Sequence, residues 1–153
     1  MLESGAVHFV VVGVTVLAVT LCVLLQYEAL VFVWRQLGRR SVERRAKVLY
    51  AILSVILVHV LEIWIFGVAI WTLLWWPATG ELYGPEYADI FECVYLSAVT
   101  FSTVGFGDIA PVGPIRFLSA TEALCGFVLI TWSASFTYLE MEKFWRAEEG
   151  EPR

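Results

Sequence analysis

The pattern of apolar and polar residues along the chain is dominated by three long apolar stretches, at about residues 7–33, 48–76 and 115–138. A helix needs about 20 apolar residues to cross the ~30 Å hydrocarbon core of a bilayer, and each stretch reaches that length. A shorter apolar run from Ile90 to Phe101 is flanked by Pro and Gly and is too short to span a membrane. The pattern therefore predicts three transmembrane helices, with a re-entrant helix between the second and the third.

The composition is that of a membrane protein. The 153 residues have a mean hydropathy of +0.76, and 59% are hydrophobic while only 16% are charged, which ordinary soluble domains do not show. The net charge of −5 gives no basic surface for nucleic acid, so no nucleic-acid partner is expected. The three cysteines lack metal-ligand spacing and are interpreted as small hydrophobic residues. The N-terminus lacks the basic start of a signal peptide, so residues 1–34 are expected to form a retained membrane helix.

Basic residues are concentrated between the first two apolar stretches, in residues 35–47. Because cytoplasmic loops are rich in Lys and Arg, we expect this loop in the cytoplasm. The N-terminus is then expected outside the cell and the short tail, residues 141–153, in the cytoplasm, with the helices crossing the plasma (inner) membrane. The loop is also a candidate site for anionic lipid head groups. Its basic residues are Arg35, Arg39, Arg40, Arg44, Arg45 and Lys47.

The stretch TFSTVGFGDIAP, residues 100–111, follows the re-entrant run. Irregular backbone inside a membrane is tolerated only where it is buried in protein or lines water. Gly105 and Gly107 accept backbone conformations that other residues avoid, so that successive carbonyl groups can point toward one axis. Rows of carbonyl oxygens can replace the water around a cation. This stretch therefore predicts a pathway for cations.

The sequence TFSTVGFGD resembles the selectivity filter of potassium channels. Residues 48–140 resemble the two-helix pore domain of that superfamily, with an outer helix at 48–76, a pore helix at 89–101, a filter at 103–107 and an inner helix at 115–138. The whole chain is similar to small bacterial pore-only channels, with an extra N-terminal helix. The resemblance implies an all-α membrane protein that assembles as a homotetrameric pore, since one filter loop cannot surround an ion. It also implies passive conduction of K+, with no enzymatic activity and no organic cofactor.

The same resemblance implies a role for each filter residue. Thr103 supplies a hydroxyl and a carbonyl to the innermost K+ site, whereas Val104, Gly105 and Phe106 supply rings of carbonyl groups, and Gly107 closes the outer end. Phe106 stands where many members of the superfamily have tyrosine. This difference removes a phenolic hydrogen bond behind the filter but keeps the aromatic ring.

Further residues are expected to support the filter from behind. Val99 occupies a place where some members of the superfamily carry a buried Glu that pairs with the aspartate after the filter. Asp108 therefore needs another partner, and Tyr95, near the middle of the pore helix, is the candidate through its hydroxyl. Thr100, a hydroxyl residue near the end of the pore helix, completes this set.

The inner helix offers two candidate faces for a cavity below the filter. A polar stripe that includes Thr131 and Ser135 favours one face. The resemblance implies a lining by Ile130 and Ala134, one residue further round the helix, and we favour this pair because membrane hydroxyls commonly bond to backbone carbonyls. Gly126, near mid-helix, is either a hinge at the gate or a point of close helix packing.

Three ionisable residues fall inside the predicted spans. His59 and Glu62 lie on one face of the second helix, and Glu122 lies at a similar depth in the third. Acids inside a membrane are candidates for function. These residues form either a cluster behind the filter that senses pH or braces the pore helix, or a set of groups that satisfy buried backbone and pore-helix hydroxyls such as Ser97 and Thr100.

Two alternative functions stay open at the level of sequence. A weakly selective cation channel would have the same fold, because the filter sequence does not show whether Phe106 holds the carbonyl rings rigidly. A non-conducting regulatory subunit would belong to another class. The intact filter sequence argues against it, because a regulatory subunit has no use for aligned carbonyl groups.

Overall fold

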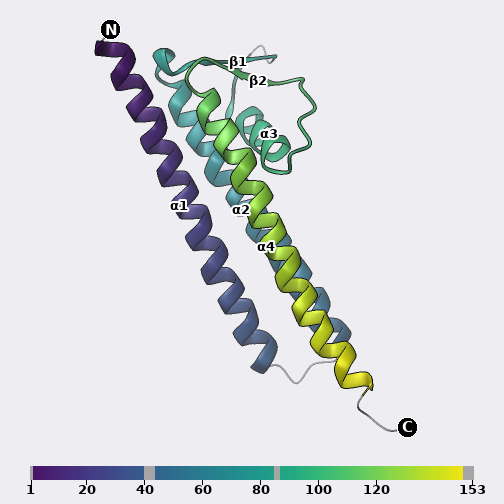
Figure 1. Ribbon diagram of the computed structural model, residues 1–153. Coiled ribbons are helices and arrows are strands. Elements are labelled where there is room, and N and C mark those ends of the chain that lie inside the picture. The colour runs from purple at the N-terminus through teal and green to yellow at the C-terminus, as the bar shows by residue number, and fades with distance from the viewer. Residues whose placement is uncertain (1, 40–43, 85–86, 150–153) are drawn as a thin grey trace.

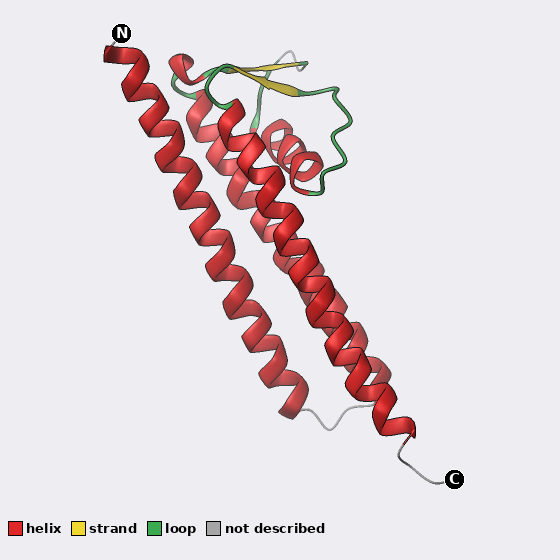
Figure 2. Cartoon of the chain, in the orientation of Figure 1, coloured by secondary structure: helices red, strands yellow, loops and turns green. Residues whose placement is uncertain are grey.

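Long helices dominate the computed structural model, which describes residues 2–39, 44–84 and 87–149 (Figures 1 and 2). Three of the described helices are long and apolar enough to cross a membrane. The predicted class, an all-α membrane protein, is confirmed. The helices are α1 (Leu2–Arg39), α2 (Arg44–Leu74), α3 (Ile90–Phe101) and α4 (Arg116–Glu149).

The long helices extend further than the sequence predicted. Helix α1 continues to Arg39 and α2 begins at Arg44, so most of the loop predicted at residues 35–47 is helical. Helix α4 continues to Glu149, through most of the tail predicted at residues 141–153. The apolar pattern marks only the part of each helix that hydrocarbon surrounds. Arg, Lys, Glu and Gln are good helix formers, and they prolong the helices into water.

Helix α1 lies along one side of the pair formed by α2 and α4, while α3 lies on the side away from α1 (Figure 1). Helix α3 packs against both α2 and α4. The outward faces of α1 and α2 remain apolar and exposed, as expected for helices surrounded by lipid. The largest side chains that are completely buried within the bundle are Phe66, Ile70, Phe101, Ile115, Leu118 and Leu129.

A small folded cap connects α2, α3 and α4 at one end of the bundle, and the sequence did not predict it (Figure 2). It contains the 3₁₀ helix η1 (Pro77–Thr79) and two antiparallel strands, β1 (Glu81–Tyr83) and β2 (Ala110–Val112), with Leu82 opposite Pro111. Strands of three residues are too short for a period-2 pattern to reveal.

The cap is fastened to the helices through Thr79, which is completely buried. Its hydroxyl lies 2.6 Å from the carbonyl oxygen of Leu73 and 2.8 Å from that of Trp76. Its own carbonyl accepts a hydrogen bond from the backbone N–H of Ile115 over 2.9 Å. Helix α2 accordingly ends at Leu74, slightly before the predicted end at residue 76, and the start of α4 is held beside it.

Candidate functional site

The short helix α3 supports the candidate site. It begins at Ile90 because the carboxylate of Asp89 accepts a hydrogen bond from the backbone N–H of Glu92 over 2.9 Å, which caps the helix. Its 12 residues span about 18 Å at ~1.5 Å per residue, which is shorter than the hydrocarbon core. The chain then turns at Ser102, whose backbone N–H donates to the carbonyl of Ala98 over 3.1 Å.

The segment after α3, Thr103–Gly107, has an alternating backbone. Thr103, Gly105 and Gly107 have positive φ values of 59°, 53° and 81°. Thr103 is the only residue other than glycine with positive φ among the described residues, and a threonine in this region is strained. The alternation gives every second residue a left-handed conformation, which lets neighbouring carbonyl groups share one direction.

Hydrogen bonds from the end of α3 hold this segment in place. The backbone N–H of Gly105 donates to the carbonyl of Val99 over 3.0 Å, and that of Thr103 donates to the carbonyl of Thr100 over 2.9 Å. The side chain of Val99 is buried and offers no polar atom to this segment. Val99 and Thr100 thus contact this segment through their backbone carbonyls, which side-chain chemistry did not reveal.

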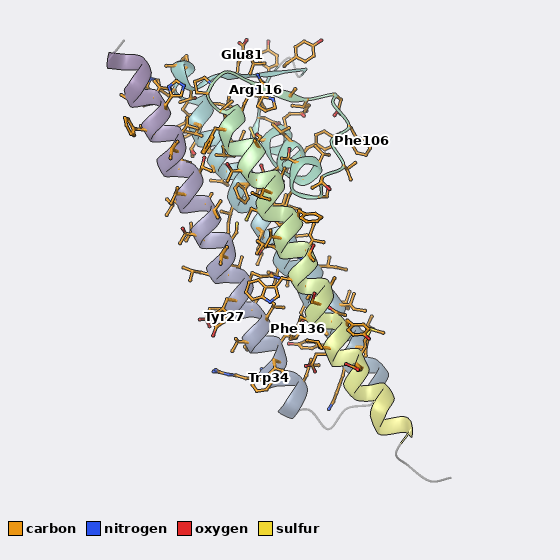
Figure 3. The ribbon with its side chains drawn as sticks, in the orientation of Figure 1. Tyr27, Trp34, Glu81, Phe106, Arg116 and Phe136 are labelled. Carbon is orange, nitrogen blue, oxygen red and sulfur yellow. The ribbon has the colours of Figure 1, made fainter. Side chains whose placement is uncertain are left out.

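Residues 102–108 are exposed on the side of the bundle away from α1. The exposed fraction is 55% for Val104 and 71% for Phe106, and the ring of Phe106 points outward from the bundle (Figure 3). A Cβ atom added to Gly105 or Gly107 would meet nothing within 4 Å. Exposed polar backbone cannot face hydrocarbon, so this surface requires water or other protein.

The C-terminal end of the segment is held by Tyr95 and Asp108. The Tyr95 hydroxyl donates a hydrogen bond to Asp108 Oδ2 over 2.7 Å, which is the contact expected from the sequence. This hydrogen bond raises the pKa of Tyr95, so the phenol keeps its proton and remains a donor. Gly84 of the cap approaches the same place, since a Cβ added there would lie 2.2 Å from the carbonyl oxygen of Asp108.

Gly126 lies where α4 touches the end of α3. A Cβ atom at Gly126 would lie 2.1 Å from the carbonyl oxygen of Phe101, so the contact requires a glycine. This geometry favours close packing over a hinge, the two roles that the sequence left open for Gly126.

The candidate cavity residues all lie on parts of α4 that this chain does not cover. Ile130 and Ala134 are exposed, and so are Thr131 and Ser135. Each hydroxyl donates to the carbonyl four residues earlier, over 2.7 Å for Thr131 and 3.0 Å for Ser135. This pattern is the ordinary way in which a membrane helix satisfies hydroxyl groups.

A buried polar cluster lies behind α3. Glu62 and Glu122 are completely buried, and His59 Nδ1 lies 2.7 Å from Glu62 Oε2. Glu122 Oε1 forms a hydrogen bond with the hydroxyl of Ser97, and this hydroxyl also lies 2.8 Å from the carbonyl oxygen of Ile63. The structure therefore divides the predicted trio into a pair on α2 and a contact between α4 and α3.

Two packing contacts were missed by sequence reasoning. A Cβ atom at Gly67 would lie 2.6 Å from a methyl group of Val94, so α2 also approaches α3 at a glycine. On α1, the buried Gln26 donates to Ser133 Oγ over 2.5 Å. A single glycine and a single glutamine inside apolar runs were the only signals in the sequence.

The candidate lipid-binding residues are only partly described. Arg35 is exposed and Lys47 is half-buried. Arg40 and the side chains of Arg39, Arg44 and Arg45 lie outside the described residues.

The fold and the site together define a pore domain: two membrane helices flank a re-entrant helix that ends in an exposed, glycine-containing segment. Residues 48–142 match the model of a family described as "Ion channel", which is more than half of the chain. The chain belongs to this family, whose pore domain is of the two-transmembrane-helix, potassium-channel type. The matched region begins after α1, so α1 lies outside it.

Two similar proteins share shorter regions with this chain. "Protein LctB" of Geobacillus stearothermophilus is 34% identical over 53 residues, which are 35% of this chain and 40% of that protein. "Protein LctB" of Bacillus caldotenax is 40% identical over 38 residues, 25% of this chain and 28% of that protein. The chain thus covers less than half of the length of these relatives. No solved structure matches the chain.

Proposed function

We propose that this protein is a potassium-selective channel in which Thr103, Val104, Gly105 and Phe106 provide the K+ sites and Gly107 closes the outer end. K+ is the transported substrate and moves passively, without enzymatic chemistry or an organic cofactor. Membership in an ion channel family supports conduction of ions. Potassium is favoured because rows of backbone carbonyl groups suit a dehydrated K+ ion.

One observation carries the proposal: the alternation of left-handed backbone at Thr103, Gly105 and Gly107. This conformation occurs in a segment that is exposed in the single chain yet tied to α3 by two backbone hydrogen bonds. A surface turn would not need a threonine in a strained conformation. A row of carbonyl ligands that must all face one ion does need such a backbone.

We further propose that the protein is a homotetramer, because a single filter segment cannot surround an ion. The exposed filter surface and the uncovered side of α4 supply area for contacts between subunits. Ile130 and Ala134 would line the narrow axis below the filter. The charge pattern also leads us to propose that the basic residues near residue 40 contact phospholipid head groups on the cytoplasmic side of the inner membrane.

The test is the reversal potential of the purified protein in planar bilayers, under a gradient of K+ against Na+. We expect a value near the K+ equilibrium potential. A value near zero would replace the proposal with a weakly selective cation channel. Absence of current from a correctly assembled protein would favour the non-conducting regulatory subunit.

A glycine variant in the filter sharpens this test. In Gly105→Ala the added Cβ meets no neighbouring atom within the chain, but the φ of +53° costs an L-residue about 1–2 kcal/mol in each subunit. We therefore expect loss of selectivity without loss of folding. Gly13→Ala on α1, where a Cβ also meets nothing within 4 Å and the backbone is helical, is the matched control and should keep the wild-type reversal potential.

A further inference from the structure

The hydroxyl of Ser97 has two oxygen neighbours but only one proton. Ser97 Oγ lies 2.8 Å from the carbonyl oxygen of Ile63 on α2, and it forms a second hydrogen bond with Glu122 Oε1 on α4. A carbonyl oxygen can only accept a hydrogen bond, and so can an ionised carboxylate. If Ser97 gives its proton to one of these oxygens, the other contact must obtain its proton elsewhere. The backbone carbonyl of Ile63 carries no proton, so the second proton must come from the carboxyl group of Glu122.

We propose that Glu122 is a neutral carboxylic acid that donates to Ser97, while Ser97 donates to the carbonyl of Ile63. The result is a relay of two hydrogen bonds that joins α4, α3 and α2 behind the filter. Glu122 and Ser97 are positioning residues in this arrangement. The location of the proton stands on geometry alone, whereas its consequence for the filter rests on the proposed channel function.

The surroundings of Glu122 agree with a neutral side chain. Glu122 is completely buried, and its Oε2 atom has no hydrogen-bond partner in the part of the chain that the structure describes. The titratable groups nearby are His59 and Glu62 on α2, Cys22 on α1 and Cys125 on α4. His59 Nδ1 is engaged by Glu62, and within the described residues the hydrogen bond of Glu122 goes to Ser97 and to none of these four groups. An ionised carboxylate buried without a cation is far more costly than a hydrogen-bonded neutral acid.

The relay lies between two points where the neighbouring helices touch α3 most closely. Helix α2 meets Val94 at Gly67, and α4 meets the carbonyl of Phe101 at Gly126. Both of these contacts are apolar or steric, and neither is a hydrogen bond between side chains. The hydrogen bonds of Ser97 lie between the two contacts in sequence and add a polar connection from α3 to both neighbouring helices.

The location of the proton can be tested without any current. We would record infrared spectra of the purified full-length protein at neutral pH and search for the C=O stretching band of a protonated carboxylic acid. We expect this band to disappear in Glu122→Gln, which keeps the shape of the side chain. In Ser97→Ala the band should move to a higher frequency, because the acid loses its hydrogen-bond acceptor. Identical spectra for wild type and Glu122→Gln in this region would overturn the proposal.

Glu62→Gln is the matched control, because it replaces the other buried acid of the cluster. The band of Glu122 should persist in this variant. Loss of the whole band in Glu62→Gln, with no loss in Glu122→Gln, would assign the proton to Glu62 and reject the relay. Circular dichroism and size-exclusion chromatography of each variant establish that the fold is intact before the spectra are compared.

A second measurement connects the relay to the filter. The amide of Gln donates a hydrogen bond as a neutral acid does, so Glu122→Gln should keep the wild-type reversal potential, while Ser97→Ala should shift it toward zero. Loss of selectivity in both variants alike would contradict the donor role of Glu122. If wild-type protein conducts no current, the proposed channel function fails, and the infrared spectra still decide where the proton lies.

Discussion

Replacing Gly126 with alanine distinguishes the two roles that a mid-helix glycine in α4 can have. Alanine forms helices better than glycine. If Gly126 is only a hinge, Gly126→Ala should therefore make the protein more stable than wild type by about 1 kcal/mol. A packing role predicts the opposite, because the new methyl group would lie 2.1 Å from the carbonyl oxygen of Phe101. The sign of the change in stability therefore separates the two roles.

The magnitude follows from the distances at this contact. The added Cβ would also lie 2.8 Å and 2.9 Å from the carbonyl carbon and Cα of Phe101, which are backbone atoms that no rotamer change can move. Non-bonded heavy atoms prefer separations of ~3.5 Å, so the two helices must separate by on the order of 1 Å. Overpacking of this kind costs about 1–3 kcal/mol, which outweighs the gain of about 1 kcal/mol in helix propensity.

The assay is thermal unfolding of the purified protein in detergent, followed by circular dichroism. We expect a lower midpoint for Gly126→Ala than for wild type, together with a changed reversal potential, because Phe101 lies two residues before the proposed filter. Gly13→Ala, on an open face of α1, should leave the midpoint unchanged or raise it. A raised midpoint for Gly126→Ala would refute the packing argument and restore the hinge.

Three further predictions concern polar contacts. We expect His59→Gln to leave the dependence of current on pH unchanged, because the amide keeps a donor for the carboxylate partner of His59; a flattened curve would identify His59 as a pH sensor. The hydrogen bond to Asp108 raises the pKa of Tyr95, so this contact persists at neutral pH and is lost only as pH rises past the ordinary tyrosine value of about 10. Asp108→Asn should therefore lower the pH at which tyrosine absorbance reports ionisation of Tyr95, and no difference from wild type would show that the contact does not form. In a double-mutant cycle, Gln26→Leu and Ser133→Ala should show a coupling of about 0.6–1.7 kcal/mol, whereas additive effects would contradict a direct hydrogen bond.

The membrane spans and the unusual backbone at Gly105 and Gly107 could be predicted because their signals are local. Hydrocarbon thickness sets the length that an apolar helix needs to cross a membrane, and the apolar run at Ile90–Phe101 is too short to do so. Gly105 and Gly107 alternate at the spacing that positive φ requires, and both adopt it. Thr103 adopts positive φ as well, and no propensity could have indicated that for a β-branched residue.

The cap could not be predicted because its strands depend on each other, and the helix ends could not be predicted because hydropathy does not mark them. Strands β1 and β2 exist because each pairs with the other, and three residues carry no periodicity of their own. The basic residues near residue 40 read as a loop because charge ends an apolar run. Charged residues nevertheless continue a helix wherever water can reach them, so hydropathy gives the membrane boundary and not the end of the helix.

The orientation of α1 was beyond sequence reasoning for a different reason. A helix that is apolar on every side has no face that prefers protein over lipid, because lipid is as apolar as a protein core. In α1 the rotation is marked by Gln26, whose amide reaches Ser133 and the carbonyl of Leu129 on α4, over 2.5 Å and 3.4 Å. A polar group pointed toward hydrocarbon would lose these bonds and have no water to replace them. Gln26 therefore marks the side of α1 that meets α4.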